Sequence, residues 1–302
     1  MTSDELGRRL REQDLGRVAE PLLAVAAPTI GLAIEAVKEA KIPVGGSKIG
    51  GRPDLPVGVD WPSWHEPMAF LGQINLAEVA PLDVEGALPA SGLLSFFYET
   101  DGEPLYSSGL EEEAGGEPEG SPGYDPSKGW RILYHEADPA TFARRRTPAK
   151  LNEAARFPAC AARFASGVSL PDIAGPEVWS LRLTAKERSA LIELDPEINR
   201  HPGEEPGYRL LGHPYSLAYS TLVTCAAESG RPPGDHRGVP PGPKWRKILR
   251  DVNAHWRLLF QVDSSEQAVM DWGGSGLLHY AIEREALRDR DFSRAWLNLQ
   301  FL

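Results

Sequence analysis

The feature that most constrains the fold is a pair of similar segments, one in the first half of the chain and one near its end. Residues 71–75 (LGQIN) are similar to residues 259–263 (LFQVD). Further along, residues 92–99 are similar to residues 276–283, in the same order. Two ordered matches predict an internal duplication whose halves pack around a pseudo-twofold axis, so that neither half has a complete core. Chance similarity between apolar strands is the alternative explanation.

Short strands and turns dominate the rest of the pattern. The chain contains 30 glycines and 27 prolines, which favours turns and short strands over long helices. Residues 29–37 fit either a strand or one face of a helix, and Pro28 and Gly31 favour the strand. The predicted strands are 29–37, 68–75, 92–99, 130–134 and, more weakly, 159–164. The sequence therefore predicts an α+β protein with mainly antiparallel sheets and a few peripheral helices.

Helices are predicted in three places. A helix capped by Ser3 should end before Pro21, and another helix is expected within residues 215–227. Thr184 and Glu187 form a capping box, which predicts a helix that ends before Pro196. We expect a single domain over residues 1–302, divided into a helical segment (1–27), a first half (28–150) and a second half (151–302).

The charge of the chain argues against two classes of partner. With a net charge of −11 and a pI near 5.2, the surface repels phosphate backbones, so no nucleic-acid partner is expected. Residues 101–128 concentrate acidic side chains and predict a solvated loop. The early apolar run at residues 22–37 is short for a membrane span and contains Pro28 and Glu35, so no membrane association is expected.

The chain opens on acidic residues with no apolar run behind them, which predicts no secretory signal. Cys160 and Cys225 are the only cysteines, so a disulfide framework is not expected and both thiols are predicted to be reduced and buried. These features predict an acidic cytoplasmic protein.

A glycine-rich loop at residues 45–56 is the first candidate for a ligand site. Backbone N–H groups at Gly50 and Gly51, together with Lys48 and Arg52, have the chemistry to hold an anion. The loop lacks the glycine spacing of a phosphate-binding P-loop, and Pro53 interrupts any helix after it. The alternative is a structural loop along the edge of a sheet.

Tryptophans and glutamines form two further sets of candidates. Trp61, Trp64 and Trp272 could provide an aromatic surface for a ligand, although ordinary core packing between the halves is the favoured explanation. Gln73 and Gln261 occupy equivalent positions in the similar segments. A buried amide needs hydrogen-bond partners, so the two glutamines pair with each other or with the backbone, or else they bind a ligand.

The sequence carries no catalytic motif that we would assign. Its seven histidines show no zinc-binding spacing, and a Gly-x-Ser-x-Gly nucleophile motif is absent. Asp263 could form a carboxylate pair with Asp271, although a role in a hairpin loop explains both. No catalytic residue, metal ion or cofactor is therefore predicted.

Several motifs together resemble those of the YwqG-like family of uncharacterised bacterial proteins. Over roughly residues 28 to 300 they are, in order, 47–56 (SKIGGRPDLP), 61–62 (WP), 70–74 (FLGQI), 88–94 (LPASGLL), 129–134 (GWRILY), 211–214 (LGHP), 258–263 (LLFQVD) and 289–293 (DRDFS). The resemblance implies an α+β fold rich in antiparallel strands and no established reaction. Two features depart from the family: no acidic residue follows Trp272-Gly273, and no glutamine follows the turn at 211–214.

Two functions follow from these observations. The first is a non-enzymatic binding or protein-interaction protein, favoured by the missing catalytic motifs, the many tryptophans and the long Pro- and Gly-rich loops. The alternative is an enzyme or sensor for a small anionic ligand. Its pocket would lie between the two repeats, near the glycine-rich loop and His213.

Overall fold

The computed structural model describes residues 1–100, 128–173, 175–200, 207–217, 220–230 and 242–301. Its helices are α1 (Ser3–Glu12), α2 (Gly16–Val25), α3 (Leu76–Val79), α4 (Pro176–Ser180), α5 (Ala185–Asn199), α6 (Thr221–Glu228), α7 (Pro243–His255) and α8 (Arg284–Arg288). The strands are β1 (Ala27–Ala36), β2 (Lys48–Ile49), β3 (Asp54–Leu55), β4 (Ala69–Asn75), β5 (Leu93–Tyr98), β6 (Trp130–His135), β7 (Ala143–Arg144), β8 (Cys160–Ser169), β9 (Arg209–Leu210), β10 (Trp256–Asp263), β11 (Leu277–Glu283) and β12 (Trp296–Gln300).

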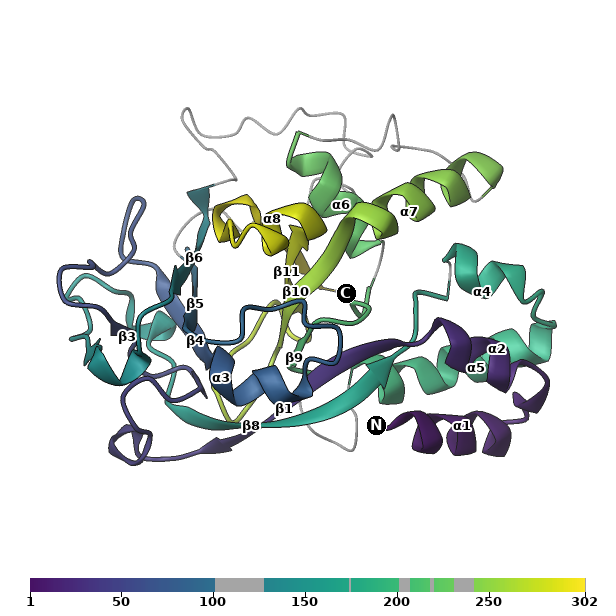
Figure 1. Ribbon diagram of the computed structural model, residues 1–302, viewed down its shortest axis with the longest axis horizontal. Coiled ribbons are helices and arrows are strands. Elements are labelled where there is room, and N and C mark those ends of the chain that lie inside the picture. Colours follow the sequence, from purple (N-terminus) through teal and green to yellow (C-terminus); the bar gives the residue numbers. More distant parts are fainter. Residues whose placement is uncertain (101–127, 174, 201–206, 218–219, 231–241, 302) are drawn as a thin grey trace.

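Ten of these strands form one antiparallel sheet, so the predicted α+β class with a large antiparallel sheet is confirmed. The strand order is β12-β11-β10-β9-β1-β8-β2-β4-β5-β6. The long strands β1 and β8 lie at the centre and pair along their whole length, from Ala27 opposite Ser169 to Ala36 opposite Cys160. Outward from this pair, each side continues with a two-residue strand and then three longer strands (Figure 1).

The two outer parts of the sheet share one aromatic core. The ring of Phe96 in β5 lies 4.7 Å from that of Phe260 and 5.1 Å from that of Tyr280. The hydroxyl of Tyr280 donates a 3.0 Å hydrogen bond to the carbonyl of Phe97. All three rings are fully buried, and a single hydrophobic cluster spans both halves of the chain. The strands of one half therefore complete the core of the other.

The longer helices lie at the periphery of the sheet. Helices α1, α2 and α5 pack against one another beside the ends of β1 and β8, and α6 and α7 pack together above the second half (Figure 1). Each group buries its own apolar cluster, centred on leucines in the first group and on Trp256 in the second. No helix in the described part of the chain is long and apolar enough to cross a membrane.

Several local predictions were wrong. Pro21 lies inside α2 and Pro196 inside α5, where helices were expected to end. In both helices the apolar face packs into a buried cluster on either side of the proline, and this packing outweighs the hydrogen bond that proline cannot make. The capping box of Thr184 and Glu187 is confirmed at the start of α5. The acidic loop predicted at 101–128 falls almost wholly outside the described residues.

A polypeptide of residues 1–150 should not fold by itself. It lacks β8, which pairs with both β1 and β2, and it lacks the rings of Phe260 and Tyr280 that cover Phe96. Circular dichroism should show no cooperative thermal transition for this fragment, whereas the full chain should unfold in a single transition. A sharp transition from the fragment would show that the first half has a core of its own.

Candidate functional site

The glycine-rich loop predicted at residues 45–56 contains two short strands. Strand β2 inserts between β8 and β4, with Lys48 opposite Ala161 on one side and Gln73 on the other. Gly50 and Gly51 follow β2 with φ angles of 65° and 73°, a conformation that favours glycine. A side chain at Gly50 would also collide with the carbonyl oxygen of Pro158. These glycines therefore let the chain leave the sheet sharply, close to the backbone that precedes β8.

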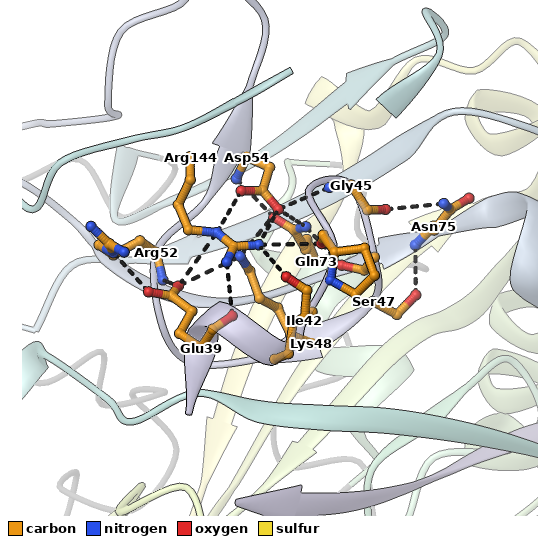
Figure 2. A network of polar contacts seen from close by, with 12 residues as sticks. Glu39, Ile42, Gly45, Ser47, Lys48, Arg52, Asp54, Gln73, Asn75 and Arg144 are labelled. Carbon is orange, nitrogen blue, oxygen red and sulfur yellow. Dashed lines mark hydrogen bonds and ion pairs between the residues drawn. The ribbon is translucent and has the colours of Figure 1, made fainter. Parts of the chain in front are cut away.

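Asp54 is the centre of a buried polar network (Figure 2). Its carboxylate lies 3.2 Å from Lys48 Nζ and 2.9 Å from Arg144 Nε. It also accepts hydrogen bonds from the side-chain amide of Gln73 at 2.8 Å and from the backbone N–H of Gly45 at 3.0 Å. Gln73 completes the arrangement by accepting from the N–H of Asp54 and donating to the carbonyl of Gly46. The network therefore ties β2, β3, β4 and β7 to the preceding turn.

Glu39 extends the network towards the surface (Figure 2). Its carboxylate accepts from the backbone N–H of Arg52 at 2.6 Å and from the Nε of Arg52 at 2.7 Å. The same carboxylate lies 3.6 Å from Lys48 Nζ and 3.8 Å from Arg144 Nε. Its side chain is 17% exposed, whereas those of Lys48 and Asp54 are 0% exposed. Glu39 therefore joins the buried ions to a guanidinium at the surface.

The pKa values in this network follow from burial and charge. Burial lowers the pKa of Lys48 to about 8, although the Asp54 carboxylate favours the charged amine. Burial by itself would raise the pKa of Asp54, but hydrogen bonds from Arg144 and the charge of Lys48 hold it below its usual value. The pKa of Glu39 is lowered for the same reason, here by Arg52 and Lys48 against the effect of burial. Both carboxylates therefore stay ionised at neutral pH.

A cavity of about 240 Å³ lies beside the network, where Arg52 leaves it. The lining residues are Val37, Glu39, Gly51, Arg52, Trp61, Phe70, Thr147, Leu151, Ala155, Arg156, Phe157, Pro158 and Ala159. The Arg52 side chain is 43% exposed, and its Nε and backbone N–H both donate to the carboxylate of Glu39. Trp61 is held in place because its indole N–H donates to the carbonyl of Met68 at 2.8 Å. The cavity thus combines positive charge with an aromatic wall.

Arg156 is the second guanidinium of the cavity. It donates to the carbonyl of Leu151 at 2.9 Å and to that of Ala149 at 3.3 Å. Within the described ranges, no carboxylate forms an ion pair with Arg156. Its charge is therefore oriented by backbone oxygens but not neutralised by them.

The second half contains a comparable polar network. Gln261 accepts from the N–H of Tyr215 at 3.0 Å and donates to the carbonyl of Gly207 at 2.7 Å. The carboxylate of Asp263 is fully buried, lies 2.9 Å from a guanidinium nitrogen of Arg200 and accepts from the N–H of Gly207. These contacts hold the residues on both sides of β9 against β10.

The predicted site residues therefore separate into groups. Gly51, Arg52 and Trp61 line the cavity, Gly50 precedes Gly51, and Lys48 and Gln73 belong to the network around Asp54. Gln261 and Asp263 belong to the network of the second half. Lys48, a candidate ligand for an anion in the sequence, is fully buried, and its amine is paired with Asp54.

Three other predicted site residues contact the backbone or other rings of the protein. His213 lies 3.2 Å from the carbonyl of Val25 through its Nε2 atom, and burial lowers its pKa. Trp272 packs edge-on against Tyr98 and Phe157, with ring centroids 5.9 Å apart in each case. Trp64 stacks on His65 at 4.3 Å. His213, Trp272 and Trp64 do not line the cavity.

The sequence analysis missed the residues that complete the site: Glu39, Phe70, Arg144, Arg156 and Phe157. Arg144 lies far along the chain from Asp54, in a two-residue strand that no periodicity marks. A lysine in an apolar, glycine-rich segment needs a carboxylate partner if it is buried, but the sequence does not say which carboxylate this is. In the described ranges, no group of three or more His, Cys, Asp or Glu side chains is arranged to hold a metal ion.

Comparison with known proteins returned a family but no function. A family model described as Domain of unknown function (DUF1963) matches residues 47–300. The match starts beside Lys48 and ends at Gln300, so it includes every predicted site residue and the network around Gln261, whereas Glu39, Gly45 and Gly46 of the first network lie before it. No curated protein matches the chain. The predicted resemblance to a family without an assigned reaction is confirmed, although the YwqG-like name is not the name of the matching family.

Replacing Asp54 should destabilise the protein more than replacing Lys48. Asp54→Ala leaves Lys48 and Arg144 as buried charges with Glu39 as their remaining carboxylate, and we expect it to lower the free energy of unfolding by about 3–5 kcal/mol. Lys48→Met keeps the volume of the side chain, and Asp54 retains Arg144 and Gln73. Its effect should therefore be smaller by at least about 2 kcal/mol.

Urea denaturation of both variants measures the difference. Glu35→Ala is a suitable control, because this exposed carboxylate pairs only with the exposed Arg163 in the described part of the chain, and the change should stay within about 0.5 kcal/mol. If Lys48→Met proved as unstable as Asp54→Ala, Lys48 and not Asp54 would be the residue that organises the network.

Proposed function

Because the chain belongs to the DUF1963 family, whose description names no activity, the function must be argued from the site, and we propose that the protein is a binding protein for a small anionic molecule. The ligand would occupy the cavity beside Arg52. The observation that carries this proposal is the meeting of Arg52 and Arg156 with the rings of Trp61 and Phe70 around one cavity.

The lining of the cavity selects the class of ligand. Arg52 and Arg156 are the cations of the lining, and Glu39, its one carboxylate, is already bonded to Arg52. Guanidinium groups favour planar carboxylates and phosphates, because two parallel N–H groups can contact two oxygens. The aromatic wall favours an apolar body. A small carboxylate carried on an aromatic or aliphatic group fits both requirements.

The chemistry of the lining favours binding over catalysis. Glu39 is a poor general acid, because its pKa is held below the usual value and it is ionised at neutral pH. Lys48 lies behind the cavity with its amine fully buried and paired with Asp54, so a ligand cannot reach it as a nucleophile. The proposed function is therefore the non-enzymatic binding favoured by the sequence, with the small anionic ligand that the sequence suggested for an enzyme or sensor.

We also infer that the two halves arose by duplication of one strand unit. Support comes from the strand order, which reads the same outward from β1 and from β8. Strands β4 and β10 also carry a bulge at the equivalent place. In addition, Gln73 and Gln261 make matching hydrogen bonds, each to one backbone N–H and one glycine carbonyl. On this basis Arg209, opposite Gln261, takes the place that Lys48 has opposite Gln73. The two networks would then be copies of one structural anchor, and the cavity a feature of the first copy.

Benzoate should bind to the protein and Arg52→Gln should weaken this binding. A charge-assisted hydrogen bond contributes about 1.5–3 kcal/mol, so the dissociation constant measured by isothermal titration calorimetry should rise about 10- to 100-fold. Arg163→Gln is the matched control, because this arginine is exposed on β8 and does not line the cavity. Its affinity for benzoate should equal that of the unmodified protein.

Benzamide, the uncharged analogue of benzoate, separates charge recognition from simple filling of an apolar space. We expect benzamide to bind more weakly than benzoate to the unmodified protein and equally weakly to Arg52→Gln. Equal affinity for the two compounds, or an unchanged benzoate affinity in Arg52→Gln, would contradict the proposed function.

The duplication predicts similar effects of Gln73→Leu and Gln261→Leu. Each change leaves a glycine carbonyl and a backbone N–H without their partner, and it should lower the free energy of unfolding by about 1–3 kcal/mol. Gln73→Leu should be the larger effect, because Gln73 also donates to Asp54. Urea denaturation, with the exposed Gln267→Leu as a control, tests this. A negligible effect at either position would show that the two amides are not equivalent anchors.

A further inference from the structure

A second cavity, distinct from the one beside Arg52, lies where the two halves of the chain meet. Its volume is about 550 Å³. One side is formed by residues 85–90, which precede β5, and the other by β10, α8 and Arg290, two residues after the end of α8. The lining residues are Glu85, Gly86, Ala87, Leu88, Pro89, Ala90, Arg257, Arg284, Leu287, Arg288 and Arg290. We call it the arginine cavity.

The charge of the arginine cavity is unusual for this protein. Four arginines line it and Glu85 is its one carboxylate, although the chain as a whole carries a net charge of −11. Glu85 pairs with Arg257 at 2.6 Å, and Arg290 pairs with Glu136 at 2.5 Å. In the part of the chain that the structure describes, no carboxylate forms an ion pair with Arg284 or Arg288. Two guanidinium groups of the lining therefore have no carboxylate of the described residues within ion-pair distance.

Arg257 is a second, independent indication of a ligand. Its side chain is 10% exposed, and its Nε atom is buried with no hydrogen-bond partner among the described residues. A buried polar group without a partner costs stability unless water or a ligand satisfies it. The partial burial of Arg284 lowers the pKa of that guanidinium, and the neighbouring charge of Arg257 lowers it further. An anion in the cavity would relieve both effects.

The spacing of the arginines selects the shape of the anion. Arg284 and Arg288 lie four residues apart on α8, so both exposed side chains project from one face of the helix with Cβ atoms about 6 Å apart. Two guanidinium groups at this separation suit two adjacent phosphate groups, since each can form paired hydrogen bonds to one phosphate. Leu88 and Leu287 leave part of the lining apolar for an organic group.

From this geometry we propose that the arginine cavity is a binding site for a small organic diphosphate, held by Arg284 and Arg288 with Arg257 at its base. The volume falls in the range typical of small-molecule sites and is small for an extended acidic peptide. Since the walls come from both halves, a bound diphosphate would join residues 85–90 to α8 and stabilise the folded chain.

Inorganic pyrophosphate is the probe that tests this site in the full chain. It should bind in isothermal titration calorimetry and raise the melting temperature. The double variant Arg284→Gln, Arg288→Gln should weaken binding at least about 100-fold, which corresponds to about tenfold for each lost guanidinium contact. Both arginines are exposed, so the circular dichroism spectrum and the melting temperature without ligand should stay unchanged.

Control measurements make the result specific. Arg52→Gln, in the other cavity, should bind pyrophosphate like the unmodified protein, and inorganic phosphate should bind at least about tenfold more weakly than pyrophosphate because it contacts one guanidinium group only. The proposal is overturned if millimolar pyrophosphate does not bind, if the double variant binds it equally well, or if phosphate and pyrophosphate bind alike.

Discussion

The burial of Asp54 is the constraint on which the first half of the structure depends. A buried carboxylate is costly without partners, and here a lysine, an arginine, an amide and a backbone N–H converge on it from separate segments. Once these donors are in place, β2 is fixed between β8 and β4, and Glu39 is fixed beside Arg52. The network thereby shapes the cavity that we propose as the ligand site, although its central ions do not face that cavity.

In this acidic chain, arginines without an ion-pair partner indicate where an anion could bind. Most arginines with described partners form ion pairs or donate to carbonyl groups, as Arg144 does with Asp54 and Arg145 with the carbonyls of Pro56 and Val59. At the two cavities, Arg156, Arg284 and Arg288 differ, because no carboxylate in the described part of the chain forms an ion pair with them. The other arginines of the cavities are each paired with a carboxylate. Since a general negative surface repels anions, sites for anions require such local concentrations of positive charge.

The two halves depend on each other through the aromatic contacts between β5 and β11. Phe96 and Tyr280 meet at the centre of one cluster, and Trp130 and Trp296 make a second contact across the halves with ring centroids 4.9 Å apart. Large rings bury much apolar surface, so each sheet half would expose a substantial apolar face without the other. The arginine cavity lies at the same junction, and so a ligand there would act on the contact between the halves.

The sequence by itself determined the elements whose signals are local: the strands β4, β5 and β6, the capped start of α5, and the similarity between the segments around Gln73 and Gln261. It also identified Arg52, Gly51 and Trp61, which do line a cavity. The tertiary structure decided the rest. Lys48, a candidate anion ligand from the sequence, is a buried ion because it pairs with Asp54 in the folded chain. Pro21 stays within a helix because α1 and α5 pack against that helix. The physical reason is that hydrogen-bond capping and strand alternation act between near neighbours, whereas ion pairing and burial depend on residues that only the complete fold brings together.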